Sequence, residues 1–551
     1  MKKKNKYKVK IPNKKGIIFV GDYVYYYTKT FWNAEKKHTD DDRVAIGRIA
    51  NEERTEMYPN ERYGEFFNYE KEEAPSIDSY LKIGPYLAIK RTCERIGLYE
   101  ALDFAFPGNY KDIIALATFA ITESSLTAQH YDRFAFSYFS GLSKTLSSSC
   151  ISGIYRKIQE CNKDDFYKKY LEGYKQAFAH TENRKLIAAI DSTNRNTASN
   201  TMIDAEYGKS KKDSNNPQVC NAYYVDELTG IPIYQEEFSG SLLDKTQLSY
   251  MTKKSNALGF NDIIAVLDRG YYSQSNIDTL KEFDFVLSVP ETVGFVKTLF
   301  KEHMDIKMQR ANYIREHNAY GIKVKIDESI NEALSNYYCY LFYDSVRAME
   351  EIDSINNKIE RFIEDIESHK YYSLALENKY KKYFTFTKIE QENSKKSLFT
   401  FKENTDAIQE AIDKAGMFLV ISNIDDSVSR ILTLERNRDR TEKCFQRLKS
   451  SIDYDAVRVY TNETKEGKDL VAFTSVCIYQ ALLYFLKPYL NEISSRTLFT
   501  TITCLSKIIA YRNKNNQWEL RYALSKEQKE ILELVDLKEN ELLKEIKEIF
   551  P

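Results

Sequence analysis

The stretch RILTLERNRDRTEKCFQRLK, residues 430–449, determines how the rest of the chain is interpreted. It contains neither Gly nor Pro and consists mainly of residues with high helix propensity, so it predicts one continuous helix. Residues three, four and seven apart lie on the same face of a helix. Arg438, Glu442 and Lys449 therefore share one stripe, on which a single carboxylate lies between two cations.

Positive charge surrounds Glu442 on this predicted helix. Nearby opposite charge favours the ionised form of a carboxylate, which can then bind a metal ion while its cationic neighbours bind phosphates. Most charged helices are solvated surfaces with ordinary ion pairs, so this helix predicts chemistry only together with acidic residues elsewhere. The further cations of the stretch are Arg430, Arg436, Arg440, Lys443 and Arg447.

Two such acidic residues follow short apolar runs that are typical of buried strands. RKLIAAIDSTN, residues 184–194, reaches Asp191 at the end of its apolar run, and DIIAVLDRGYYS, residues 262–273, reaches Asp268. Ligands of open α/β sheets bind at the carboxyl ends of strands, so we expect both carboxylates at one edge of a sheet. A strand-end Asp is also a common turn former or helix cap, and that alternative stays open for each residue alone.

The segments around these residues predict a mixed α/β sheet. VCNAYYVDELTGIPIYQEEFSG indicates two strands joined by a turn at Asp226 to Gly230. After the strand that ends at Asp268, Ser273 or Ser275 is placed to start a helix. DFVLSVPE (284–291) and AGMFLVISN (415–423) are two further predicted strands.

Composition excludes several classes of protein. The 551 residues carry 80 Lys and Arg against 81 Asp and Glu, a net charge of −1, so DNA binding must come from local basic patches rather than from a global field. The eight Cys form no C-x-x-C pair, which argues against a zinc module or a disulfide scaffold. The most apolar stretch, residues 471–486, is short for a membrane span. We therefore expect a soluble cytoplasmic protein with no membrane partner.

Three carboxylates without clustered His or Cys predict Mg²⁺ or Mn²⁺ rather than zinc. Two such ions, about 3.5–4 Å apart, serve in-line phosphoryl transfer at a phosphodiester. Arg438 and Lys449 would then bind phosphates or developing negative charge. No Walker or dinucleotide glycine motif is present.

These three acidic segments resemble the conserved blocks of bacterial insertion-sequence transposases of the DDE type. AIDSTN and VLDRGYYS resemble the two Asp blocks, and RNRDRTEKCFQRLK resembles the Tyr–Arg–Glu–Lys signature of one large group. Arg438, Glu442 and Lys449 have the spacing of that signature, whereas Glu435 stands at its Tyr position. The departure puts in doubt a contact with the DNA backbone that the resemblance would otherwise imply.

The resemblance implies a ribonuclease H-like catalytic core that an insertion interrupts before the Glu helix. It implies that Asp191, Asp268 and Glu442 bind two Mg²⁺ or Mn²⁺ ions. It also implies that the protein binds the terminal inverted repeats of its element as double-stranded DNA, works as a synaptic homodimer and transfers the element to target DNA. The DNA-contacting residues predicted on this basis are Arg269, Tyr271, Tyr272, Arg436, Arg438, Arg440 and Lys449; packing at the strand–helix junction is an equal alternative for the two Tyr.

The domain organisation follows from the same segments. The aromatic strands near the N-terminus predict a small sheet whose rings form a core more often than they stack on bases. A helical apolar stripe between residues 349 and 366 predicts internal packing of the insertion or a dimer contact. The predicted parts are a β-rich region (1–77), a helical DNA-binding region (78–183), the catalytic core (184–294 and 412–490), the insertion (295–411) and a helical C-terminal unit (491–551).

Three other functions remain compatible with parts of the pattern. A metal-dependent nuclease or a domesticated relative would cut or bind DNA without transposing. A DNA-binding scaffold would need none of the three carboxylates. A glycoside hydrolase would use two carboxylates about 5–9.5 Å apart, and it would not need the cations around Glu442.

Overall fold

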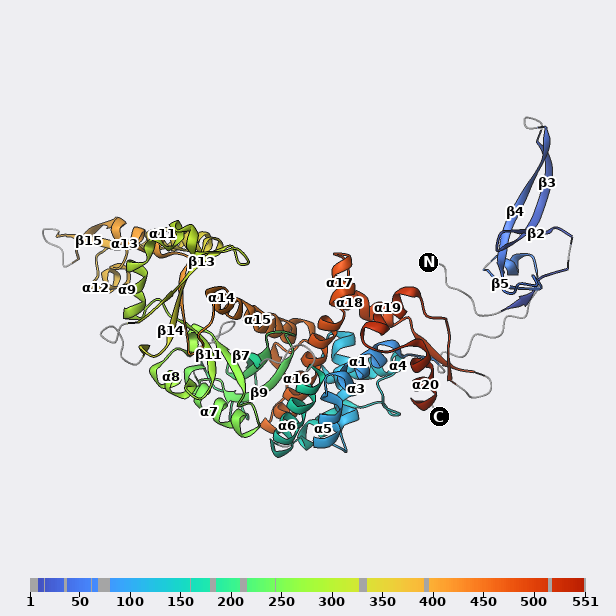
Figure 1. Cartoon of the computed structure of the whole chain (residues 1–551), viewed down its shortest axis with the longest axis horizontal. Helices are drawn as coiled ribbons and strands as arrows, with labels where there is room; N and C mark the ends of the chain where they lie inside the picture. The colour runs from blue at the N-terminus through green and yellow to red at the C-terminus, as the bar shows by residue number, and fades with distance from the viewer. Residues whose placement is uncertain are drawn as a thin grey trace. The chain divides into compact units, whose positions relative to one another are not determined.

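The computed structural model describes residues 8–13, 15–33, 37–60, 62–67, 80–158, 160–178, 185–208, 216–242, 244–326, 334–390, 396–513 and 518–549. The chain divides into two compact units, and both are discontinuous in sequence. The first contains residues 1–162, 451–454 and 466–551, and the second contains residues 163–450 and 455–465. Figure 1 shows their helices and strands.

A large mixed sheet forms the centre of the second unit. Its strands are ordered β12-β13-β14-β17-β11-β10-β7-β8-β9, and β18 pairs with β7 beside this path. The strands are β7 (Leu186–Thr197), β8 (Gln218–Asp226), β9 (Pro232–Ser239), β10 (Ile263–Leu267), β11 (Asp284–Val289), β12 (Tyr313–Ile314), β13 (Ala319–Val324), β14 (Tyr338–Asp344), β17 (Met417–Ser422) and β18 (Ala456–Val457).

The central sheet contains both parallel and antiparallel strand pairs. β7, β10 and β11 run parallel to one another, whereas β8 runs antiparallel to both β7 and β9. β17 runs antiparallel to β11. The predicted mixed sheet is therefore confirmed, and its hairpin turn, its strand at 263–267 and its Ser273 helix cap are confirmed as well. The arrangement is consistent with a ribonuclease H-like core.

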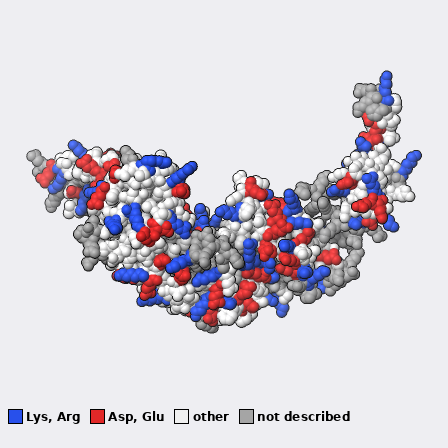
Figure 2. Space-filling model, viewed as in Figure 1, with Lys and Arg blue, Asp and Glu red and all other residues white. Residues whose placement is uncertain are grey.

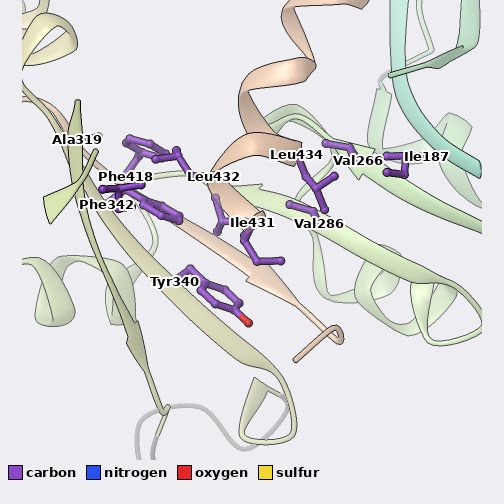
Figure 3. Packing of buried hydrophobic residues seen from close by; sticks show 12 residues of the cluster. Ile187, Val266, Val286, Ala319, Tyr340, Phe342, Phe418, Ile431, Leu432 and Leu434 are labelled. Atoms are coloured by element: carbon purple, nitrogen blue, oxygen red, sulfur yellow. The ribbon is translucent and has the colours of Figure 1, made fainter. Parts of the chain in front are cut away.

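Helices cover both faces of this sheet (Figure 1). α14 (Val428–Asn437) packs on one face, where Leu434 belongs to a buried apolar cluster with Ile187 of β7 and Val266 of β10. Figure 3 shows these side chains between the helix and the strands. Side chains two residues apart in a strand share a face, so Asp191 and Asp268 also face this helix. The opposite face is covered by α7 (Asp244–Ala257), whose Ser255 hydroxyl hydrogen-bonds the Tyr224 hydroxyl at 3.0 Å.

The helix at residues 430–449 is interrupted, so the prediction of one continuous helix is wrong. α14 ends at Asn437, α15 (Asp439–Gln446) follows, and a π-helical turn (Arg447–Ser451) closes the segment. Around Arg438 the backbone makes tighter bonds between residues three apart, from Arg438 N to Glu435 O (3.3 Å) and from Thr441 N to Arg438 O (2.9 Å). No Gly or Pro causes this break; it coincides with the half-buried Arg438 side chain, which inserts among acidic groups.

The strand that carries Asp191 is longer than its apolar run. We expected it to end at Asp191, but β7 continues for six more residues to Thr197. The extension is polar, yet it is held in the sheet because β8 pairs with it as far as Asn196 and β18 pairs with its last two residues. Long-range pairing thus overrides the local loss of hydrophobicity.

The expected insertion at 295–411 has two structural parts. Its first part includes α9 (Gly294–Glu302) and contributes β12, β13 and β14 to the central sheet. The second part forms its own small core, in which Ile359 and Ile366 of the helical stripe are buried. The stripe therefore packs inside this part, although Met349 at its start is 70% exposed. The elements are α11 (Ser345–Glu367), α12 (Leu374–Tyr380), β15 (Phe384–Ile389), β16 (Leu398–Glu403) and α13 (Thr405–Lys414).

The first unit begins with a five-stranded antiparallel sheet in the order β1-β5-β4-β3-β2. Val24, Ile46 and Met57 are buried in its core. Of the rings that the sequence predicted to form this core, Tyr26 packs against it, whereas Phe31 and Trp32 are exposed. Its strands are β1 (Val9–Lys10), β2 (Ile17–Val20), β3 (Tyr23–Asn33), β4 (His38–Ile49) and β5 (Glu56–Pro59).

The rest of the first unit is mainly helical. Lys90 of this unit forms ion pairs with Glu94 and Glu545. Ser525 and Gln528 form a capping box. The elements are β6 (Tyr80–Lys82), α1 (Gly84–Arg95), α2 (Leu98–Ala105), α3 (Tyr110–Glu123), α4 (Tyr131–Ser137), α5 (Ser148–Lys157), most of α16 (Asn462–Phe485), α17 (Lys487–Glu492), α18 (Leu498–Leu505), β19 (Ile509–Arg512), β20 (Trp518–Leu520), α19 (Lys526–Leu534) and α20 (Glu539–Ile549); α6 (Glu160–Ala177) lies largely in the second unit.

Charge is distributed without one dominant sign. Figure 2 shows basic and acidic side chains intermingled over the face in view, as the net charge of −1 leads one to expect. Within the described residues, no helix has the length and apolar character needed to cross a membrane.

Candidate active site

Asp191 and Asp268 lie at the same level on neighbouring parallel strands. β10 pairs with β7 so that Leu267 stands opposite Ile190. Asp191 follows Ile190 within β7, and Asp268 directly follows Leu267, the last residue of β10. Adjacent strands are about 4.8 Å apart. The two carboxylates therefore lie side by side on the face that α14 and α15 cover.

Short backbone contacts orient both Asp side chains. Asp191 Oδ1 accepts a hydrogen bond from Ser192 N at 2.8 Å, and Asp268 Oδ1 accepts one from Arg269 N at 2.7 Å. Asp268 thereby caps a 3₁₀ turn (Arg269–Tyr271). The cap alternative considered from the sequence thus applies to Asp268, and capping does not prevent its carboxylate from facing the helix.

Arg438 brings the acidic residues of the sheet and the helix together. Its Nη1 atom is 3.5 Å from Asp268 Oδ1 and 3.9 Å from Glu442 Oε1, and its side chain is only 19% exposed. Burial lowers the pKa of the guanidinium, but neighbouring carboxylates outweigh this effect and raise it. Those carboxylates belong to Asp268, Glu435, Asp191 and Glu442.

Glu442 is held over the sheet by the helix turn that follows it. Phe445, one turn later on α15, packs against the ring of Tyr223 with a centroid distance of 5.4 Å. Tyr223 of β8 stands directly opposite Asp191 of β7. This aromatic contact packs the helix turn that follows Glu442 against the sheet, while 63% of the Glu442 side chain is exposed.

The three carboxylates have the donor chemistry of a Mg²⁺ or Mn²⁺ site, because these hard cations prefer carboxylate oxygens. In the parts of the chain that the structure describes, no three His, Cys, Asp or Glu side chains are arranged to hold a metal ion. The geometry explains this, since the Arg438 guanidinium lies between Asp268 and Glu442. The donor types fit such an ion, and in this structure Asp268 and Glu442 pair with Arg438 instead.

Glu435, at the Tyr position of the signature, adds a further acidic group. Burial raises its pKa, whereas Arg438, Arg347 and Arg436 favour its charged form. The Glu435 carboxylate also helps to raise the pKa of Arg438.

Arg436 and Arg440 contact protein groups rather than open solvent. Arg436 forms an ion pair with Asp344, and its Nη1 atom donates to the carbonyl of His317 at 2.8 Å. Arg440 donates to the backbone carbonyls of Glu227 and Leu228. Arg436 therefore fastens α14, and Arg440 fastens α15, to neighbouring parts of the sheet.

The other residues predicted to contact DNA differ in exposure. Arg269 is exposed, Tyr272 is half-buried, and Lys449 is half-buried within the π-helical turn. Tyr271 is 1% exposed, which favours the packing alternative for this ring.

The sequence did not predict Glu227, a buried acidic residue beside α14 and α15. It lies in the β8–β9 turn, is 1% exposed, and burial raises its pKa to about 8. Asn437, Arg440 and Arg430 of the two helices partly oppose this shift. The turn sequence D-E-L-T-G is typical of an exposed turn, so it does not predict that Glu227 is buried. The helices beside Glu227 lie about 200 residues later in the sequence.

A comparison with protein families decides the identity. The family described as "Transposase DDE domain" matches residues 182–478, more than half of the chain and the whole region that carries the three carboxylates. The chain belongs to this family. As a DDE transposase, it is a DNA-cleaving enzyme of mobile elements, and transposases of this family generally depend on divalent metal ions.

Other comparisons add little to this assignment. This chain is similar to the cryo-EM structure of the piggyBac transposase synaptic complex with hairpin DNA. The sequence identity is 10%, the match covers 85% of each chain, and the TM-score is 0.36. No curated protein matches the sequence.

Proposed function

We propose that this DDE transposase is encoded by a bacterial insertion sequence, binds the terminal inverted repeats of that element, cleaves phosphodiester bonds and transfers the 3′ ends to target DNA. The observation that carries this proposal is the pairing of Leu267 with Ile190, which brings Asp191 and Asp268 to one level on adjacent strands. Glu442 approaches the same place through Arg438. The resemblance of the sequence blocks supports the finer assignment.

The proposed ligands of two Mg²⁺ or Mn²⁺ ions are Asp191, Asp268 and Glu442. When bound, such ions activate the attacking hydroxyl and stabilise the leaving oxygen of a phosphodiester. The backbone hydrogen bonds to Asp191 Oδ1 and Asp268 Oδ1 hold one oxygen of each carboxylate in a fixed direction. Preorganised ligands of this kind avoid a reorganisation cost during the reaction.

Arg438 is the proposed phosphate contact closest to the reacting bond. Its guanidinium is already held between carboxylates, and a guanidinium binds phosphate oxygens in a bidentate manner. Arg269 and Lys449 supply further positive charge to the DNA in this proposal, whereas Arg436 and Arg440 act mainly by fixing the helix.

The proposed partners are double-stranded DNA at the element ends and in the target, and a second copy of the chain in a synaptic homodimer. The piggyBac complex is a synaptic complex with hairpin DNA by its description; for this chain, the dimer and the excision route rest on the sequence resemblance. We place the protein in the bacterial cytoplasm, at the nucleoid when it is bound to DNA. Membership of the Tyr–Arg–Glu–Lys group is proposed with Glu435 as a departure from the signature.

The experiment that tests this function is cleavage and strand transfer on duplex DNA from the ends of the element with Mg²⁺ or Mn²⁺. Asp191→Asn, Asp268→Asn and Glu442→Gln should each reduce cleavage by at least about a thousandfold while DNA binding changes little, because each removes a ligand charge but preserves shape. Cleavage that survived any one of these substitutions would disprove the site.

A metal-dependent nuclease that does not transpose is the alternative function. The same three carboxylates would support it, so the site variants cannot separate the two. Strand-transfer products joined to a target plasmid would establish the transposase reaction, whereas cleavage without joined products would favour the nuclease.

A further inference from the structure

A second site lies at the far end of the strand that carries Asp191. A pocket with a volume of about 300 Å³ opens where β7 ends, and it is lined by residues 196–199, Asn216 and residues 457–460. All of these residues belong to the second unit. The pocket is formed because β18 extends the sheet at this point, with Ala456 opposite Asn196 and Val457 opposite Thr197.

The walls of the pocket are fixed by specific contacts. Ser199 Oγ donates to the carbonyl of Tyr460 at 2.9 Å, and the Thr201 hydroxyl donates to the same oxygen. Val457 is buried in a small apolar cluster with Met202 and Val219. The pocket is thus a preformed concavity rather than a gap between unsupported loops.

The lining has the chemistry of a nucleotide site. None of its residues is acidic, and it combines the amide groups of Asn196 and Asn216 with the guanidinium of Arg458 and the ring of Tyr460. Tyr460 is 73% exposed, and an exposed ring can stack on any base. Arg458 is about half exposed and shares an ion pair of 3.4 Å with Asp455, so it is positioned at the surface for a phosphate.

The position of the pocket relates it to the proposed active site. Asn196 follows Asp191 by five residues on one strand, which corresponds to about 17 Å at the usual rise of a β-strand. A strand of B-form DNA advances about 3.4 Å per nucleotide. A DNA strand that runs along β7 from Asp191 would span this distance in about five nucleotides.

We propose that this pocket binds one nucleotide of the substrate DNA, about five positions from the scissile phosphate, by stacking on Tyr460 and by a phosphate contact to Arg458. The proposal rests on the proposed function and on a DNA path along β7, because the nucleotides are counted along this strand from Asp191 as a metal ligand. It assigns to the strand end of β7 a role in positioning DNA, separate from the carboxylates.

The test uses the full chain and a DNA duplex that the wild-type protein cleaves with Mn²⁺. The duplex carries one 5-iodouracil, placed in turn at each position on both sides of the cleavage site. Irradiation should give a crosslink to Tyr460 at a position about five nucleotides from the cleavage site. The variant Tyr460→Ala/Arg458→Gln should lose that crosslink and bind the duplex at least about tenfold more weakly, since a stacked base contributes about 1–3 kcal/mol.

A matched control removes the same chemical groups elsewhere. Tyr250 and Lys253 are exposed on α7, which covers the opposite face of the sheet. Tyr250→Ala/Lys253→Gln also loses one ring and one positive charge, and it should leave DNA affinity and the crosslink unchanged. Thermal unfolding of both double variants checks that they fold.

The other outcomes distinguish a wrong pocket assignment from a wrong proposed function. If the wild-type protein cleaves its DNA but Tyr460 never crosslinks and the double variant binds normally, the pocket assignment is wrong and the active site stands. Saturable binding of free thymidine monophosphate with unchanged DNA affinity would make it a small-molecule pocket instead. If the wild-type protein neither binds nor cleaves DNA, the proposed function fails together with the pocket.

Discussion

Glu227 is a buried acid whose protonation is linked to folding. Its pKa is about 8 in the folded chain against an ordinary value of 4.5, chiefly because burial disfavours the charged form. Between these two values the unfolded chain releases this proton while the folded chain keeps it. The contribution of Glu227 to stability is therefore fully present below about pH 4.5 and is lost as the pH rises towards 8.

We expect Glu227→Gln to remove this pH dependence. The variant should match the wild type near pH 4.5 and should be more stable near pH 8, by on the order of 3 kcal/mol. Chemical denaturation at several pH values measures the difference. Parallel stability curves for the two proteins would show that Glu227 titrates normally and that its burial has been misjudged.

Arg438 neutralises the acidic residues around it and competes with a metal ion for them. Arg438→Gln removes a cation 3.5 Å from Asp268 and 3.9 Å from Glu442, so like charges repel until a cation binds. Mn²⁺ should therefore raise the melting temperature of the variant more than that of the wild type. Cleavage should nevertheless fall by about ten- to a hundredfold, because the phosphate contact is lost.

The control for Arg438 is Lys443→Gln, which removes an exposed positive charge from α15, the helix that follows Arg438. Its melting temperature should respond to Mn²⁺ as the wild type does. An equal response of the Arg438 variant would mean that the guanidinium does not occupy the metal position.

At the scale of elements, α14 and α15 are positioned by contacts at several points along their length. Leu434 packs on the sheet, Phe445 packs on Tyr223, and Arg436 pairs with Asp344. The break at Arg438 lets α14 and α15 each follow its own contact.

Asp344 links the catalytic helix to the segment that interrupts the core. Its Oδ1 atom accepts hydrogen bonds from Val346 N (2.9 Å) and Arg347 N (3.2 Å) at the start of α11, and its carboxylate pairs with Arg436. Asp344→Ala should lower the free energy of unfolding by about 2–3 kcal/mol, because it removes a helix cap and leaves a partly buried arginine unpaired. Denaturant titration measures this loss.

Asp425→Ala is the comparison for Asp344. Asp425 also pairs with a cation, Lys323, but its side chain is 63% exposed, and exposed pairs contribute about 1 kcal/mol or less. Equal losses in the two variants would contradict the special role of Asp344 as cap and tie.

At the scale of the whole molecule, both units are assembled from distant parts of the sequence. The second unit contains all three proposed metal ligands, and the first contains none of them. A ligand that binds only the folded form of one unit stabilises that unit.

Calorimetry should therefore resolve two unfolding transitions, and Mn²⁺ should raise the temperature of one of them. The Asp191→Asn/Asp268→Asn variant should keep both transitions and lose the response to Mn²⁺, because the donor oxygens for the ion are gone. A single cooperative transition, or a shift of both by the ion, would refute this expectation.

The sequence by itself determined the local features of the site. Apolar runs gave the strand that ends at Leu267, the turn at Asp226 to Gly230 and the Ser273 cap, because propensity and periodicity act over a few residues. Residue type and spacing also singled out the carboxylates Asp191, Asp268 and Glu442.

Only the tertiary structure decided how these pieces meet. Asp191 and Asp268 lie side by side because of the register of two strands about 75 residues apart in the sequence. The extension of β7 depends on pairing with β18, which lies further still along the chain. The ion pair between Arg438 and Asp268 and the burial of Glu227 beside α14 and α15 also join distant segments. Such contacts form between segments that are remote in sequence, so no local pattern records them.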